Sequence, residues 1–166
     1  MKRALRYLLP ALLAVGAGCY HLGPVGQVRY RSVAVPMFKN RTLKPQLEAQ
    51  VTNAIIKRLH ADGTVRVDWE ADADVLVTGL ITRYDRGILR TQKDDTTVPR
   101  EYRLSLEVLV QARDRVTGQM IFPPTTLTGH SDAFVGHDLQ SAEEQALPLI
   151  PDDIARQVVS LLVERW

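Results

Sequence analysis

The chain has 166 residues, a formal net charge of +2 at pH 7 and a hydrophobic content of 45%, which together fit one globular domain with a substantial core. The basic residues Lys2, Arg3 and Arg6 stand in an N-terminal leader, so the remaining chain is nearly neutral and has no electrostatic basis for binding nucleic acid. One cysteine, Cys19, excludes a framework of disulfides within the chain.

Residues 1–18 have the organisation of a secretory signal peptide. A basic start precedes an apolar run at residues 8–17, and small residues lead directly into Cys19. As a helix this run would span only ~15 Å, about half of the ~30 Å core of a bilayer. We therefore expect a cleaved signal rather than a permanent transmembrane helix.

The segment Ala17-Gly18-Cys19 resembles a bacterial lipobox. The resemblance implies that the signal is cut before Cys19, which is then acylated on its thiol and on its new amino terminus. An ordinary signal peptide with an incidental cysteine is the alternative. Tyr20 stands where the inner-membrane retention signal has aspartate, so the resemblance implies an outer-membrane address facing the periplasm.

The rest of the chain divides into a tether and one domain. Residues 19–31 contain glycine and proline and are expected to be a lipidated tether, whereas residues 32–166 are expected to fold. Hydrophobic periodicity predicts the elements in chain order. They are a strand at 32–38, a helix at 45–62, strands at 64–69, 74–84, 102–114 and 120–134, and a C-terminal helix that opens at Ser141, breaks or kinks at Pro148 and Pro151 and continues from Asp152.

The clearest pattern lies in helix 45–62, and the next clearest in strand 102–114. The apolar residues of the helix recur with a 3.6-residue period and so form one face, namely Leu47, Val51, Ala54, Ile55 and Leu59. Apolar and polar residues alternate along the strand, which predicts one buried and one polar face. Pro36 cannot donate to a ladder, so strand 32–38 is expected at an edge or with a bulge.

The order of these elements predicts an α+β fold. Residues 86–100 are polar and are expected to form a turn between strands. A strand, a helix, several strands and a final helix predict a two-layer sandwich, with two helices packed on one face of a mixed, mainly antiparallel sheet of about four strands.

The residue pattern contains no convincing catalytic or metal site. The run His130-Ser131-Asp132 resembles part of a hydrolase triad, but in a strand Ser131 faces away from its two neighbours. The acidic residues between positions 68 and 74 lack the glycine and glutamate spacing of an EF-hand loop. We therefore expect a protein that is not an enzyme and needs neither a metal nor a cofactor.

The order of several short motifs resembles the LptE family of lipopolysaccharide-assembly lipoproteins, and the resemblance spans nearly the whole chain after the leader. The motifs are Gly18-Cys19-Tyr20-His21-Leu22, Val35-Pro36-x-Phe38-x-Asn40-x-Thr42, Ala73-Asp74, Gly79, Tyr84, and residues 154–162 with Trp166. The chain lacks the glycine that the family often has between the cysteine and the tyrosine.

The resemblance implies a lipoprotein on the periplasmic side of the outer membrane. Such a protein plugs the lumen of an LptD-type β-barrel, assists the assembly of that barrel and contacts lipopolysaccharide on its way to the cell surface. A lipoprotein activator of a periplasmic cell-wall synthase is the rival function, although it would usually carry a long linker after its cysteine. An anchored hydrolase is a third class, which the missing nucleophile and base disfavour.

Segment 83–103 is basic on balance and supplies candidate lipid-binding residues. Arginine side chains suit phosphate groups because their guanidinium forks match phosphate geometry. Together with the resemblance, this predicts that Arg86, Arg90 and Lys93 bind the phosphates of lipid A. A surface hairpin of mixed charge, without a ligand, is the alternative.

Overall fold

The computed structural model describes residues 30–91, 99–135 and 138–164, with side chains except at residues 90–91 and 99–100. Within these ranges six strands form one sheet. They are β1 (Ser32–Ala34), β2 (Lys39–Asn40), β3 (Arg66–Val67), β4 (Val75–Thr91), β5 (Pro99–Asp114) and β6 (Met120–Phe134). The expected α+β sandwich with helices on one face of a mixed sheet is confirmed, with more strands than the four expected.

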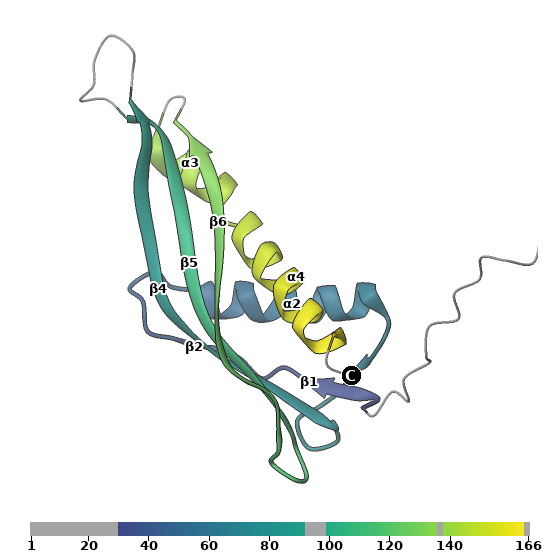
Figure 1. Cartoon of the computed structure of the whole chain (residues 1–166). Coiled ribbons are helices and arrows are strands. Elements are labelled where there is room, and N and C mark those ends of the chain that lie inside the picture. Colours follow the sequence, from purple (N-terminus) through teal and green to yellow (C-terminus); the bar gives the residue numbers. More distant parts are fainter. Residues whose placement is uncertain (1–29, 92–98, 136–137, 165–166) are drawn as a thin grey trace, which may run out of the picture.

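The sheet has a short parallel part and a long antiparallel part. Its order is β3–β1–β4–β5–β6, and β2 pairs with β4 further along. The short strands β1, β2 and β3 are all parallel to their partners, whereas β4, β5 and β6 form two successive antiparallel pairs. Figure 1 shows these three long strands as a curved arm that extends past the helices.

The expectation that strand 32–38 lies at an edge is wrong. Only residues 32–34 of it form a strand, β1, which lies between β3 and β4, and the separate strand β2 pairs with β4 alone. Pro36 falls in the break between β1 and β2, where no ladder hydrogen bond from its nitrogen is needed. The proline therefore lies after the end of β1 and does not put that strand at an edge.

The expected turn at residues 86–100 is also wrong at both ends. β4 continues to Thr91 and β5 begins at Pro99, with Arg86 opposite Leu104 and Ile88 opposite Tyr102. Polar side chains are compatible with these strands because one face of the arm is open to solvent. The register shifts at Ile88–Thr91, which indicates a bulge near the end of the described arm.

In the part of the chain that the structure describes, three helices lie on one side of the sheet (Figure 1). They are α2 (Leu47–Asp62), α3 (Leu139–Ala146) and α4 (Leu149–Val163). Helix α2 begins two residues after the predicted Pro45 and ends as predicted at Gly63, whose positive φ of 72° suits glycine and whose N–H donates to the Leu59 carbonyl.

The C-terminal helices differ from expectation at their N-termini. Ser141 is not the cap of α3, because Asp138 takes that position and its carboxylate accepts from the Ser141 N–H at 2.8 Å. The break near Pro148 is confirmed. Helix α4 begins at Leu149 rather than at Asp152, since Pro151 lies in its first turn, where an N–H has no helical partner.

The core lies between the three helices and the sheet. The predicted face of α2 is buried, and Leu104, Leu106, Val108 and Val110 of β5 are all 0% exposed, which confirms the alternation. Packing begins at Tyr30, which is already buried in the same core. Cys19 and most of the predicted tether lie outside the described residues.

Candidate functional site

The three residues of the triad-like run do not form a catalytic group. Ser131 is buried on the helix side of β6, whereas His130 is exposed on the other side. The carboxylate of Asp132 is held by Arg103 of β5 in two hydrogen bonds of 2.8 and 3.0 Å. This hydrogen-bonded pair lowers the pKa of Asp132, so the group acts as a cross-strand ion pair.

Within residues 30–91, 99–135 and 138–164, His, Cys, Asp and Glu side chains do not gather in any group of three or more that could hold a metal ion. The helices of that same part of the chain include none with the length and apolar character to cross a membrane.

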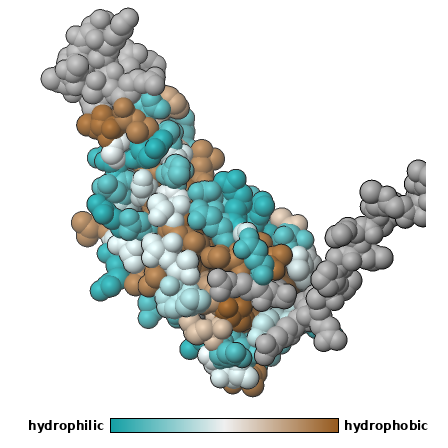
Figure 2. All heavy atoms as spheres, viewed as in Figure 1, coloured by the Kyte–Doolittle hydropathy of each residue, from teal (hydrophilic) through white to brown (hydrophobic). Residues whose placement is uncertain are grey.

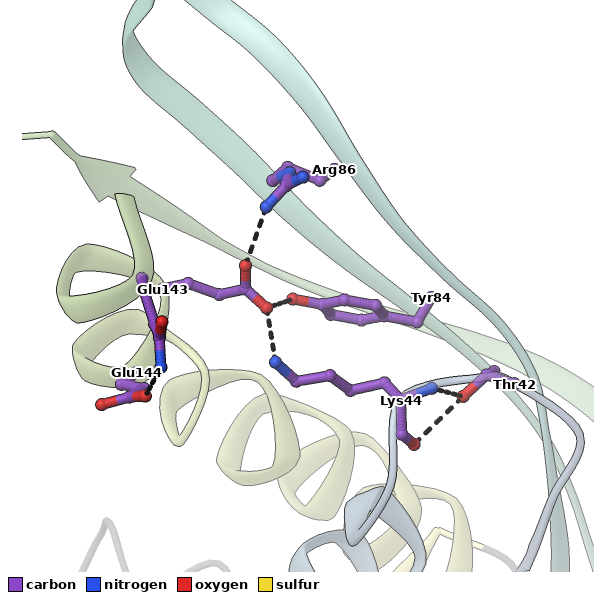
Figure 3. A network of polar contacts seen from close by, with 7 residues as sticks. Thr42, Lys44, Tyr84, Arg86, Glu143 and Glu144 are labelled. Carbon is purple, nitrogen blue, oxygen red and sulfur yellow. Dashed lines mark hydrogen bonds and ion pairs between the residues drawn. The ribbon is translucent and has the colours of Figure 1, made fainter. Parts of the chain in front are cut away.

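The most developed polar cluster surrounds Glu143 of α3, where three segments of the chain meet (Figure 3). Its Oε1 accepts from Lys44 Nζ at 2.7 Å and from the Tyr84 hydroxyl at 2.8 Å, and its Oε2 accepts from Arg86 Nη1 at 3.0 Å. Glu143 itself is only 9% exposed. A carboxylate this buried requires such partners, because an unpaired charge would be strongly destabilising.

Local structure explains how the partners reach Glu143. Tyr84 and Arg86 are two residues apart in β4, so both side chains leave the sheet on the helix side. Lys44 belongs to the segment between β2 and α2, where the Asn40 carboxamide oxygen accepts from the backbone and the hydroxyl of Thr42. These contacts fix the segment and aim Lys44 at α3.

The cluster keeps Glu143 ionised. Burial raises the pKa of Glu143, but hydrogen bonds from Lys44 and Tyr84 and the charges of Lys44 and Arg86 outweigh burial, so its pKa lies below the ordinary 4.5. Burial, together with the hydrogen bond to Glu143 and its charge, raises the pKa of the Tyr84 hydroxyl far above its usual range. The tyrosine therefore remains a donor, and the cluster binds α3 to the arm.

The predicted phosphate-binding residues lie along the outer part of the arm. Arg86 belongs to the Glu143 cluster, and its guanidinium also lies 5.7 Å from the centre of the Tyr102 ring. Arg90 is on β4 with its backbone opposite Glu101, and Lys93 lies outside the described residues. Of these three side chains the structure describes that of Arg86, which is half exposed.

Exposed apolar side chains accompany these basic residues. Ile88 is 59% exposed and Phe134 is 71% exposed, and both lie on strand ends at the far end of the described arm. Figure 2 shows hydrophobic residues gathered at this end, above a mostly hydrophilic stretch. The register puts Ile88 on the same sheet face as Arg86, whereas Phe134, next to the buried Ala133, lies on the opposite face.

The face of the arm that points away from the helices is mostly polar, although Leu80 and Leu109 pair on it and Phe134 is exposed on it. Arg103 and Asp132 pair on it, Gln111 donates to the Thr78 hydroxyl at 3.2 Å, and Thr82 donates to the Glu107 carbonyl at 3.2 Å. These contacts link β4, β5 and β6 across the sheet. The alternation along strand 102–114 predicted this face, whereas the Glu143 cluster was missed because its members are far apart in the sequence.

Solved structures share this fold at low sequence identity. A minor lipoprotein from Acinetobacter baumannii is 20% identical with a TM-score of 0.55, and the match covers 80% of this chain and 92% of that one. Rare lipoprotein B from Shewanella oneidensis is 13% identical with a TM-score of 0.55, covering 81% and 95%. Protein XCC0632 from Xanthomonas campestris is 8% identical with a TM-score of 0.64, covering 86% and 89%.

Sequence comparison is more specific than these structural likenesses. Curated proteins yield no significant match to this sequence. The profile of the family described as LptE, lipopolysaccharide-assembly, matches residues 30–162. That match includes all of the described strands and nearly all of the helical residues. The chain therefore belongs to the LptE family of lipopolysaccharide-assembly proteins.

Proposed function

We propose that this chain is an outer-membrane lipoprotein, anchored on the periplasmic side through acylated Cys19, that plugs an LptD-type β-barrel and assists its assembly. In this role it serves the transport of lipopolysaccharide to the cell surface. The observation that carries the proposal is the family match over residues 30–162. The lipobox-like residues before Cys19 support its acylation, and the acylated cysteine is the anchor.

The surface chemistry of the arm supports a position inside a barrel. Barrel interiors of outer-membrane type are polar and water-filled. The outward face of β4, β5 and β6 offers hydroxyls, amides and a paired arginine and aspartate to such a wall. A polar face can be wetted or hydrogen-bonded there without the desolvation cost that an apolar wall would impose.

The end of the arm where β4 ends at Thr91 and β5 begins at Pro99 is the region that we assign to lipopolysaccharide. Lipid A carries both phosphates and acyl chains, so a matching surface needs cations beside apolar groups. Arg86, Arg90 and Lys93 supply the cations, and Ile88, on the same sheet face as Arg86, supplies exposed apolar surface. Hydrogen bonds between guanidinium groups and phosphate are charge-assisted and therefore among the stronger ones.

Identification of the partner tests the proposal. The acylated protein, tagged at its C-terminus, is purified from detergent-solubilised cell envelopes, and co-purifying proteins are identified and quantified. We expect an LptD-type barrel in an amount close to that of the tagged chain. Recovery of a periplasmic cell-wall synthase as the main partner, with the barrel absent, would assign the chain to the activator class.

A further inference from the structure

Trp69 is an unusually exposed aromatic residue beside an apolar hollow. It follows β3 at the edge of the sheet and is 82% exposed. The hollow beside it has a volume of about 460 Å³. Asp68 and Glu70 contribute to its lining, but most of the lining is aliphatic and comes from Ala34, Val35, Pro36, Ile56 and Val67. We call Trp69 and this hollow the β3 surface. A large indole left in water beside unfilled apolar surface indicates a partner that covers both.

The chain enters the described domain beside the β3 surface. β1 pairs in parallel with β3, with Val33 opposite Val67, and the Asp68 N–H donates to the Val33 carbonyl at 2.9 Å. The chain between Cys19 and Tyr30 spans at most about 40 Å when fully extended, at ~3.3–3.6 Å per residue. The chain enters the domain at β1, which neighbours β3. On the proposed anchor, Tyr30 therefore lies within about 40 Å of the leaflet that holds the acyl chains.

The charges around Trp69 indicate which kind of membrane surface the β3 surface could contact. Asp68 is paired with Arg66 at 2.6 Å. Glu70 and Asp72 are exposed and make no ion pair with any side chain that the structure describes. Two free carboxylates repel an anionic surface, but they match the ammonium groups of zwitterionic ethanolamine headgroups.

We propose that the β3 surface docks on the headgroup and glycerol layer of a zwitterionic leaflet, with Trp69 inserted at that level. The indole suits this layer because its ring is apolar and its N–H can donate to a headgroup or carbonyl oxygen. The inference rests on the proposed lipid anchor at Cys19. It assigns the domain a fixed orientation on the membrane, in place of free rotation on its tether.

Tryptophan fluorescence tests the docking. The chain has two tryptophans, so Trp166→Phe leaves Trp69 as the only one. The acylated Trp166→Phe protein is reconstituted in vesicles of phosphatidylethanolamine and phosphatidylcholine, with and without spin-labelled lipid whose label lies near the headgroup. We expect a blue-shifted emission and several-fold stronger quenching of Trp69 than of a control tryptophan.

The control is the triple variant Leu43→Trp, Trp69→Phe, Trp166→Phe. Leu43 is fully exposed and precedes α2, whereas β3 follows α2, so ~24 Å of helix lies between the two sites. Equal quenching of the two tryptophans, or none of Trp69, in protein that floats with the vesicles would overturn the docking and leave the lipoprotein function intact. Failure of the protein to float would overturn the docking and the anchor together.

Discussion

The carboxylate of Glu143 joins the segment before α2, the arm and α3 at one point. Because its pKa in the folded chain lies below the ordinary 4.5, its contribution to stability is present above that pH and is lost as the pH falls through the folded pKa. Glu143→Gln removes charge-assisted hydrogen bonds, and since Lys44 and Arg86 are partly exposed we expect a loss of about 1–3 kcal/mol.

Thermal melts at neutral pH and at pH values below 4.5 measure this effect. The difference between the wild-type protein and Glu143→Gln should be largest at neutral pH and should shrink on acidification. Glu144→Gln is the matched control, because Glu144 is exposed and the structure gives it a hydrogen bond from Gln140 alone on its own helix. A Glu143→Gln protein as stable as this control at neutral pH would contradict the role of the cluster.

Gly79 of β4 is a position where a side chain has no room. A Cβ there would collide with the ring of Phe38, which is 2% exposed. We expect Gly79→Ala to displace that ring and to lower the free energy of unfolding by about 1–3 kcal/mol. Denaturant unfolding measures the change. Gly87→Ala on the same strand is the control, because its Cβ would meet open space, and a similar loss in both variants would contradict the account.

The assignment of lipid-binding cations needs variants that leave the Glu143 cluster intact. Arg86→Glu would put a second carboxylate beside Glu143, so the test uses Arg90→Glu with Lys93→Glu. We expect the double variant to bind purified lipopolysaccharide at least several-fold more weakly, because two favourable contacts with phosphate become repulsive. Lys57→Glu with Arg58→Glu, on the exposed side of α2, changes the charge equally. Equal weakening in both double variants would remove the site from the end of the arm.

At the scale of elements, α2 is the helix that closes the core over the sheet. Ile55 is fully buried on its inner face, so Ile55→Asp places an unpaired charge in the core. We expect a loss of several kcal/mol against a typical total of ~5–15 kcal/mol, and therefore a partly or wholly unfolded protein. Circular dichroism melts check this. Asn53→Asp, on the exposed side of the same helix, should melt like the wild type, and an unchanged melt of Ile55→Asp would mean that this face is not buried.

The elements that the sequence predicted well have a strong local signal. The period of α2 and the alternation of β5 both come from repeated burial on one face, and Gly63 ends α2 through its own φ. The length of β4 was underestimated because its outer part is polar and gains its strand geometry from pairing with β5. The spacing of Ser141 and Glu144 predicted Ser141 as the N-cap of α3. The N-cap is Asp138, three residues earlier, whose carboxylate accepts a hydrogen bond from the Ser141 N–H.

The candidate site was predictable only in part. A basic segment can be recognised in a sequence, so Arg86 and its neighbours were found. The Glu143 cluster joins Lys44, Tyr84 and Glu143, which are far apart in the sequence. No local sequence pattern predicts a contact between such distant residues. The exposure of Ile88 and Phe134 was not predicted either, because an apolar residue in a strand is ordinarily expected to face the core.

At the scale of the whole molecule, the arm, the helical layer and the anchor have separate roles in the proposed function. The polar outer face of the arm is the surface for the barrel wall, the end of the arm is the surface for lipopolysaccharide, and the core between helices and sheet holds both in place. The described chain enters the domain just before β1, so this end of the domain lies next to β3 and the β3 surface. A protein arranged in this way can orient a barrel partner relative to the membrane.

The amount of correctly folded LptD-type barrel in the outer membrane, measured after depletion of this protein, tests the central claim most directly. If the chain is the barrel's plug and assembly partner, depletion should lower the folded barrel and make the outer membrane permeable to large hydrophobic antibiotics, and re-expression of the wild-type chain should restore both. Normal levels of folded barrel in depleted cells would contradict the account.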